Sequence, residues 1–304
     1  MSGLNQILIE ELQKNGLEAK IVSISHIQDI KDEIASLKEQ SLFNENFYDE
    51  NLRSRMEYNY LDTMPDAKSI LIIACPQMIT PLKFEYHGKS HTVIIPPTYV
   101  YSEANERVES TVKQVLTPYK FSMAGTRLPA KLMAVRSGLA TYGKNNISYI
   151  NGLGSFHRLF TFITDMPCNE DHWRETAVMP ECSTCSACSK ACPTSSIDDQ
   201  RFLIRAEKCI TNLNEYTGDF PEWFDKSWHN SLVGCMKCQV VCPKNKEFIH
   251  QDIKEITFTA EEVETLLKNT PQEQLPCQLR EKLDKLNMMD YYNVIGRNLS
   301  VLIS

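Results

Sequence analysis

The stretch Glu181-Cys-Ser-Thr-Cys-Ser-Ala-Cys-Ser-Lys-Ala-Cys-Pro193 decides how this chain folds, because it spaces four cysteines as Cys-x2-Cys-x2-Cys-x3-Cys-Pro. Three thiolates on one tight loop can bind three irons of a 4Fe–4S cluster, and the fourth, on the following helix, reaches a second cluster. A shorter motif, Cys235-x2-Cys238-x3-Cys242-Pro243, follows without its leading cysteine. The two motifs together predict a bacterial dicluster ferredoxin-like module.

The missing ligand of the second motif is supplied by Cys209, the one spare cysteine nearby, which precedes Cys235 in the chain. The crossed arrangement of dicluster ferredoxins divides the eight cysteines into two groups of four. The first set is Cys182, Cys185, Cys188 and Cys242, and the second set is Cys192, Cys209, Cys235 and Cys238. Paired zinc sites are the alternative, since Cys-x2-Cys repeats also make zinc ribbons, but the x2-x2-x3-Cys-Pro run favours iron and sulfur. The other three cysteines are interpreted as small buried hydrophobic residues: Cys75, Cys168 and Cys277.

Length and composition narrow the class of protein. The 304 residues suffice for two domains, and 42% hydrophobic with 23% charged residues excludes a disordered or fibrous chain. The balance of 32 basic and 39 acidic residues, 32 − 39 = −7, argues against a nucleic-acid coat protein. The longest apolar run, residues 70–75, is far shorter than the roughly 20 residues that span a bilayer. Acidic residues stand where a signal peptide would be basic, so we expect a soluble cytoplasmic protein.

Hydrophobic periodicity before the cysteines predicts alternating helices and strands, which favours one α/β domain. The predicted helices cover residues 4–15, 27–37, 103–116 and 129–137, and the predicted strands cover residues 19–24, 68–75, 91–95, 146–150 and 158–164. The last two strands are expected to be joined by the turn at residues 151–154.

Helical signals return after the cysteines. Thr259 and Glu262 have the spacing of a capping box, residues 278–289 read as a helix, and residues 299–303 form an apolar tail. We therefore expect three domains, at residues 1–166, 167–250 and 251–304.

A basic segment lies within the predicted α/β domain. Residues 110–164 contain no Asp or Glu and carry seven cations: Lys113, Lys120, Arg127, Lys131, Arg136, Lys144 and Arg158. Its glycines allow close backbone approach to a ligand, and the cations would suit an anionic or amide-rich cofactor. The alternative is a solvated basic face that acids elsewhere in the fold neutralise.

Several short motifs of this region give the chain a specific resemblance. The chain resembles epoxyqueuosine reductases over roughly residues 60–250. The motifs that carry the resemblance are Ala134-Val-Arg-Ser-Gly-Leu-Ala-Thr-Tyr-Gly-Lys-Asn145, then Gly154-Ser-Phe156, then Thr164-Asp-Met-Pro167 before the cysteines. That family is related to the reductive dehalogenases. The resemblance implies a nitroreductase-like α/β domain that binds cobalamin with its base off the metal. A dicluster module and a short helical C-terminus would follow this domain.

The resemblance also implies where the cofactor lies and what the protein interacts with. Carried over by position, the corrinoid would contact Ser148, Tyr149, Ile150, Leu159 and Phe162, and residues 235–238 would face it from the cluster domain. Electrons would come from a low-potential donor such as a ferredoxin or flavodoxin. The substrate would be a small electrophile or a tRNA.

Two features depart from the family pattern. The family has a proton-donating aspartate before the glycine motif, whereas this chain has Ala124 at the position that aligns with it. Many members continue into a helical-repeat tail used on tRNA, whereas this sequence ends at Ser304, soon after Cys242. We therefore expect a reductase with a different substrate. Tyr101, Tyr142 and Lys144 are the candidate proton donors.

Three alternatives remain open from the sequence. The chain could bind or reduce a corrinoid for another protein without a substrate of its own, or carry electrons without any corrinoid. It could also be a true tRNA epoxyqueuosine reductase that uses another proton donor.

Overall fold

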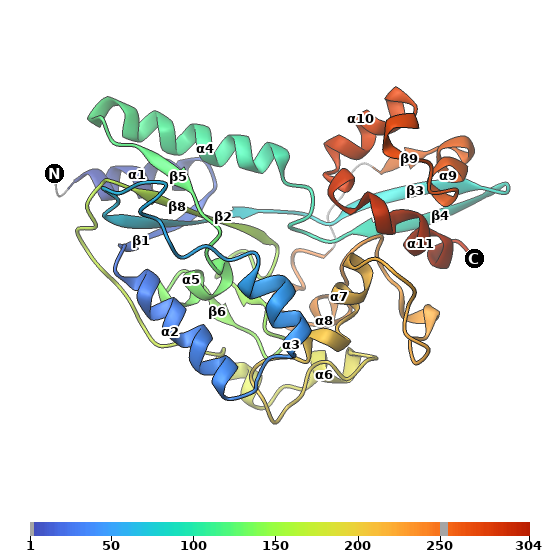
Figure 1. The fold of residues 1–304 in the computed structure, drawn as a ribbon, viewed down its shortest axis with the longest axis horizontal. Helices are drawn as coiled ribbons and strands as arrows, with labels where there is room; N and C mark the ends of the chain where they lie inside the picture. Colours follow the sequence, from blue (N-terminus) through green and yellow to red (C-terminus); the bar gives the residue numbers. More distant parts are fainter. Residues whose placement is uncertain (1–2, 250–254) are drawn as a thin grey trace. The chain divides into compact units, whose positions relative to one another are not determined.

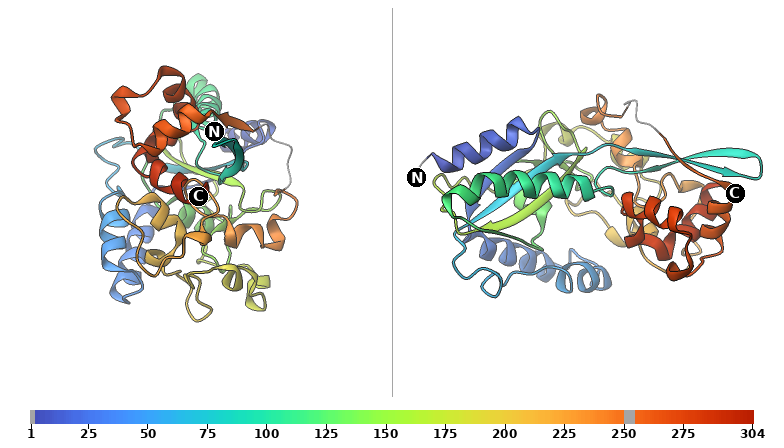
Figure 2. Two further views of the ribbon diagram at one scale, coloured as in Figure 1. Left: turned by 90° about the vertical axis from the view of Figure 1, so that its right-hand side faces the viewer. Right: turned by 90° about the horizontal axis from the view of Figure 1, so that it is seen from above.

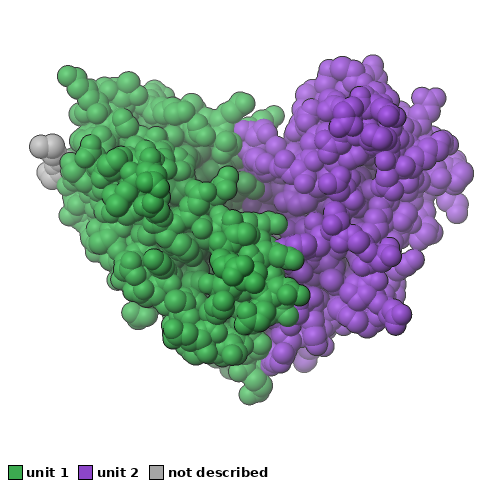
Figure 3. All heavy atoms as spheres, in the orientation of Figure 1, with its two compact units in different colours: residues 1–76, 103–185, 199–203 green, residues 77–102, 186–198, 204–304 purple. Residues whose placement is uncertain are grey.

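A computed structural model describes residues 3–249 and 255–304 of the chain and divides into two compact units (Figure 3). Unit 1 is formed by Met1–Pro76, Glu103–Cys185 and Asp199–Leu203, and unit 2 by Gln77–Ser102, Ser186–Asp198 and Ile204–Ser304. The three domains expected from the sequence stay a prediction, because the units divide the chain by packing alone. The expected boundary between residues 250 and 251 lies outside the described residues.

Unit 1 is built around an antiparallel four-stranded sheet with the order β1-β2-β8-β5 (Figure 1). Its strands are β1 (Glu18–Ser23), β2 (Ser69–Pro76), β5 (Met123–Gly125) and β8 (His157–Thr164). Strand β2 is central, and all its residues except Pro76 are buried. A strand covered on both faces needs no alternation of polar and apolar residues, which explains its continuous apolar sequence.

Helices cover both faces of this sheet (Figure 1). On one face, α1 (Leu4–Lys14) and α4 (Ser102–Leu116) pack against alternate β2 residues that include Leu71 and Ile73. On the other face, α2 (His26–Glu39) and α5 (Ala130–Arg136) pack against the intervening residues, Ile70 and Ile72. The period of two along β2 therefore separates two hydrophobic cores. The short elements of unit 1 are α3 (Glu45–Phe47), β6 (Thr141–Tyr142) and β7 (Ser148–Tyr149).

The two strands predicted on either side of residues 151–154 are present as β7 and β8. They do not pair with each other, because β7 pairs with β6 whereas β8 pairs with β2 and β5. An isolated bridge between Ile150 and Gly154 joins the two sides of the intervening turn. The turn redirects the chain between two sheets, which the local turn signal could not reveal.

Unit 2 combines a small sheet, the cysteine segments and the C-terminal helices. Its sheet has the order β4-β3-β9, and Figure 2 shows the long hairpin of β3 and β4 beside the C-terminal helices. The elements are β3 (Thr80–Tyr86), β4 (Lys89–Ile95), α6 (Ala187–Ala191), α7 (Ile210–Glu215), α8 (Lys237–Val240), β9 (Ile256–Phe258), α9 (Ala260–Leu267), α10 (Cys277–Lys285) and α11 (Tyr292–Leu302). The predicted capping box at Thr259 and Glu262 is confirmed at the start of α9. The predicted apolar tail forms the end of α11.

The mixed α/β architecture with a helical C-terminus is confirmed. Within residues 3–249 and 255–304, no helix has the length and apolar character needed to cross a membrane.

Candidate metal centre

All eleven cysteines are free thiols, so none of the motif cysteines is consumed in a disulfide. The eight motif cysteines are each half-buried, and Cys75 is fully buried as its sequence context predicts. Cys277 is exposed rather than buried, so the buried interpretation is wrong for this residue. Cys168 is half-buried.

The second set lies entirely within unit 2. Burial, and then neighbouring Cys235 and Cys192, raises the pKa of the Cys209 thiol to about 11. These three sulfurs are thus close enough for their thiolates to repel one another. Positively charged iron removes that repulsion, so the donor set fits a cluster. Among the described residues, no group of three or more His, Cys, Asp or Glu side chains lies close enough together to hold a single metal ion.

The two motifs build similar local structure. Cys188 lies in α6 and Cys238 in α8, and these short helices pack against each other in unit 2. Each helix ends before a Cys-Pro pair, because proline has no N–H group to continue a helix and restricts the residue before it. In each motif the last two cysteines therefore lie about one helical turn apart.

The four cysteines of the first set are divided between the two units. Cys182 and Cys185 belong to unit 1, whereas Cys188 and Cys242 belong to unit 2. In unit 1, Lys144 Nζ donates to the carbonyl oxygen of Cys185 at 2.7 Å and pairs with Asp199 at 2.9 Å. Lys144 therefore holds the cysteine loop. The division of the eight ligands into two sets stays a prediction.

The other two candidate proton donors, Tyr101 and Tyr142, are also poorly suited to donate a proton: one is hydrogen-bonded to a carboxylate and the other is buried. Tyr101 Oη donates to Asp290 at 2.5 Å, within unit 2. Burial, and then nearby Glu33, raises the pKa of Tyr142 well above its ordinary value. A tyrosine with a raised pKa is a poorer acid at neutral pH.

The residues expected to contact the corrinoid lie in unit 1 and mostly together. Ser148, Tyr149 and Ile150 are buried and consecutive, and Leu159 packs in the same hydrophobic cluster as Ile150. Phe162 packs in the cluster on the opposite face of the sheet, because it is an odd number of residues from Leu159 along β8. Four of the five are therefore brought together, and the corrinoid contacts stay a prediction.

A buried histidine that no sequence motif indicates lies beside these residues. Ser148 Oγ is 3.0 Å from His157 Nε2, while His157 Nδ1 is buried and has no well-aligned hydrogen-bond partner among the described residues. Burial lowers the pKa of His157 to about 4, against a smaller opposing effect of the Gly154 backbone, so the imidazole is neutral at pH 7. A buried polar atom without a good partner is costly, and a bound amide-rich cofactor would supply one. The residues here fit a corrinoid.

The basic segment is largely neutralised by acids from elsewhere in unit 1. Its ion pairs are Lys113–Glu109, Arg127–Glu57, Arg136 with Glu33 and Glu175, and Lys144–Asp199. At least four of the seven cations are thus paired with carboxylates of the described residues, as the alternative of a balanced basic face predicts. The formal +7 of the segment overstates its attraction for an anion.

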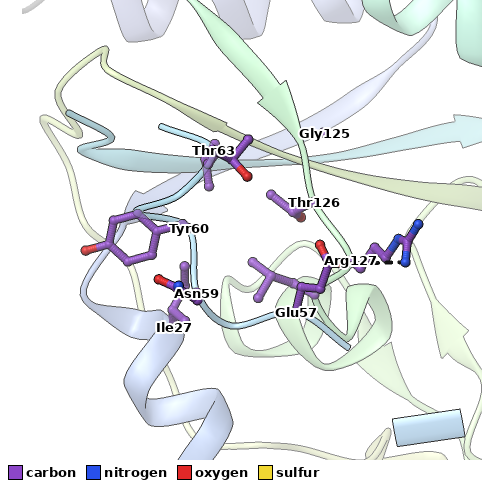
Figure 4. Close-up of a pocket in the computed structure, with 10 residues that line it drawn as sticks. Ile27, Glu57, Asn59, Tyr60, Thr63, Gly125, Thr126 and Arg127 are labelled. Carbon is purple, nitrogen blue, oxygen red and sulfur yellow. Dashed lines mark ion pairs between the residues drawn. The ribbon is translucent and has the colours of Figure 1, made fainter. Parts of the chain in front are cut away.

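Ala124 lies in the edge strand β5, opposite Ile163 of β8, and is partly buried. Two carboxylates from other segments come near this strand. Asp165 accepts a hydrogen bond from the Ser122 N–H at 2.8 Å, and Glu57 pairs with Arg127 at 3.3 Å. Figure 4 shows the small pocket at the end of β5, next to that ion pair. The pocket is lined by Ile27, Glu57, Asn59, Tyr60, Thr63, Gly125, Thr126, Arg127, Leu128 and Ile163.

Comparison with known protein families shows the class of the cysteine-containing segment. Residues 181–245 match the family model of a 4Fe-4S double cluster binding domain, which confirms the prediction of two 4Fe–4S clusters. The chain is thus an iron–sulfur protein with an α/β unit.

Matches to individual proteins and solved structures extend over more of the chain and show which proteins it resembles. An epoxyqueuosine reductase of Aliivibrio fischeri is 32% identical over 143 residues, which are 47% of this chain but only 37% of that protein. The structure of epoxyqueuosine reductase from Bacillus subtilis, with a catalytic aspartate loop swung out of the active site, covers 99% of this chain and 81% of its own at 21% identity and a TM-score of 0.70. An epoxyqueuosine reductase with an epoxyqueuosine-modified tRNA-Tyr stem loop gives the same TM-score at 20% identity, with the same coverage. The resemblance to epoxyqueuosine reductases is confirmed, and the chain has their fold.

Proposed function

We propose that this protein is a cobalamin-dependent iron–sulfur reductase of the epoxyqueuosine reductase type, acting on an electrophile other than epoxyqueuosine in tRNA. The observation that carries the reductase proposal is the double cluster binding domain in a chain with the epoxyqueuosine reductase fold. Two clusters transfer electrons one at a time from a low-potential donor such as a ferredoxin or flavodoxin. Cobalamin, when bound, supplies a low-potential cobalt centre for reducing an electrophile.

The residues of unit 1 then have separate tasks. Ser148, Tyr149 and Ile150 form a buried, mostly apolar surface that holds the corrinoid and excludes water. His157 offers its buried Nδ1 to a polar group of the cofactor. Lys144 fixes the loop of Cys185 through its hydrogen bond to the backbone.

The substrate proposal rests on the missing acid. The Bacillus subtilis protein has a catalytic aspartate loop, whereas Ala124 offers only a methyl group in a short strand paired with β8. General acid catalysis contributes about 100- to 10,000-fold to a rate. Asp165 is engaged with the Ser122 backbone and Glu57 with Arg127, so neither simply replaces the missing group. A substrate whose reduction needs no strong acid suits this arrangement.

A second candidate function is epoxyqueuosine reduction in tRNA with another proton donor. The curated relatives named epoxyqueuosine reductase and the solved complex with a tRNA stem loop favour it. Against it stand the missing acid and the net charge of −7, since neutralising phosphates dominates the affinity for nucleic acids.

A complementation experiment separates the two. The full chain is expressed in a strain that lacks epoxyqueuosine reductase, and tRNA nucleosides are measured by mass spectrometry. We expect epoxyqueuosine to persist, while Ala124→Asp restores part of the queuosine. Full restoration by the unaltered chain would establish the second candidate.

Binding of the cofactor is tested independently. Anaerobically prepared protein is mixed with cob(II)alamin and desalted, and the EPR spectrum is recorded. Retention with a base-off hyperfine pattern supports the proposal. If the spectrum shows only free base-on cofactor, the protein does not bind the corrinoid and is an electron carrier without one.

A further inference from the structure

A polar side chain contacts a sulfur of the second set. Asn230 Nδ2 lies 3.3 Å from Cys235 Sγ and 3.2 Å from the carbonyl oxygen of Trp228, while Asn230 Oδ1 accepts from the Met236 N–H at 2.8 Å. The backbone donor of Met236 fixes which amide atom is oxygen. The group directed at Cys235 is therefore the NH₂ group, which donates.

The loop that carries Asn230 is held by buried amides of unit 2. Asn298 of α11 donates through Nδ2 to the carbonyl oxygens of Asn214 and Leu232, each at 2.9 Å. Asn214 donates in turn to the carbonyl oxygen of Gly234 at 2.8 Å, and Ser231 Oγ donates to the same oxygen at 2.9 Å. The side chains of Asn214, Ser231 and Asn298 are fully buried. Helix α11 thus joins the segment after Cys209 to the segment before Cys235.

Arg297 adds to this connection from the same helix. Its guanidinium donates to the carbonyl oxygens of Leu213 at 2.9 Å and Tyr216 at 2.8 Å. These carbonyls lie at the C-terminal end of α7, where carbonyl groups have no partner within the helix. The helix that begins after Cys209 is therefore capped by α11.

The first motif has no asparagine at the corresponding position. The two Cys-x3-Cys-Pro runs align Cys185 with Cys235, so the position matching Asn230 is Pro180, whose side chain cannot donate. An N–H···S hydrogen bond stabilises the more negative, reduced form of a cluster more than the oxidised form. The Asn230 amide should therefore contribute to a difference in reduction potential between the two clusters, beside the hydroxyl groups of Thr194 at Cys192 and Thr211 at Cys209.

We propose that Asn230 raises the reduction potential of the cluster bound by the second set, and that Asn298 is the positioning residue that holds the Asn230 loop in place. This inference rests on the proposed binding of two 4Fe–4S clusters. It assigns to the C-terminal helix a role in tuning electron transfer.

The test is an anaerobic redox titration of the full reconstituted chain followed by EPR. Cys209→Ser, which should retain only the first cluster, assigns the two signals. In Asn230→Leu we expect the reduction equilibrium constant of the second cluster to fall about tenfold, equivalent to 59 mV for one electron, with the first cluster unchanged. Asn293→Leu, on the exposed part of α11, is the control and should shift neither. An unchanged second potential, or equal shifts of both clusters, would overturn the proposal.

Two further measurements test the proposal in case Asn230→Leu does not bind its clusters. Asn230→Asp keeps the oxygen that accepts from Met236 but has no N–H, so it should fold and also lower the second potential. In the unaltered protein, ¹⁵N in asparagine side-chain amides should couple to the reduced second cluster in pulsed EPR, and no coupling would refute the hydrogen bond. Less than about eight irons per chain in the unaltered protein would instead contradict the proposed function.

Discussion

The two cysteine motifs reach similar local structure by different means. The first motif holds four cysteines within residues 182–192, and Lys144 fixes its loop through one hydrogen bond to the Cys185 carbonyl oxygen. The second motif is predicted to take Cys209 from outside as its fourth ligand, and the intervening chain is held in place by Asn214, Asn298 and Arg297. The difference shows that a cluster site can depend on residues far along the chain that never touch iron.

The largest effect should come from removing the borrowed ligand. Cys209→Ser should abolish the second cluster and leave the first, lowering iron from about eight to about four per chain. Iron analysis and EPR check this, with Cys277→Ser at an exposed cysteine as the matched control. Near-complete iron retention in Cys209→Ser would show that Cys209 is not a ligand.

A steric change beside Cys235 should come next. Gly234 has φ +67°, and a Cβ there would lie 2.5 Å from Tyr99 Oη. Gly234→Ala should reduce the free energy of unfolding by about 2–5 kcal/mol, combining left-handed strain and overpacking.

Denaturation of the variant under anaerobic conditions measures this loss. Gly152→Ala, with φ +77° and open space around the new methyl group, should show only the backbone strain of about 1–2 kcal/mol. Equal losses in the two variants would mean that Tyr99 does not confine the second motif.

Loss of the buried amide in α11 should have a smaller effect. Asn298→Ala leaves the Asn214 and Leu232 carbonyls without their donor and should cost about 1–3 kcal/mol. The second cluster should also lose iron to a chelator faster than the first. Asn293→Ala on the exposed face of the same helix is the control, and similar behaviour of both variants would contradict the role of α11.

The last effect is the smallest at neutral pH and should grow on acidification. Burial, and then Arg297, lowers the pKa of His229 to about 4 from the ordinary 6.5. A depressed histidine pKa stabilises the folded protein fully above pH 6.5, and this contribution is lost as pH falls from 6.5 towards 4. His229→Asn should flatten the decline in melting temperature over this range, whereas His172→Asn at an exposed position should not.

The sequence predicted the cysteine sites better than their surroundings. Cysteine spacing is a local property, and the clusters are confirmed from it. Most helices and strands of unit 1 were also predicted, because β2 and α4 have strong hydrophobic patterns. Strand β3 was missed, since Pro81 and Lys83 interrupt its pattern and its partners lie on β4 and the distant β9.

The residues that hold the second motif could not be found from local patterns. Asn298 lies between Ile295 and Leu299 on the buried face of α11, and a polar residue on an apolar face was the available signal. Its partners, Asn214 and Leu232, lie in distant segments of the chain. The charge of residues 110–164 was overestimated for the same reason, because Glu33 and Glu57 that neutralise it lie in other segments.

The position of Asn298 in the chain also sets an order of events during synthesis. Cys242 is the last motif cysteine to be made, and residues 243–298 must follow before the Asn298 amide exists. At about 5–20 residues per second, the ribosome needs roughly 3–11 s to make that interval. During this time all eight cysteines have been made but the amide that joins the Cys209 and Cys235 segments has not. Delivery of iron and sulfur to the second site is therefore best timed after α11 has left the ribosome.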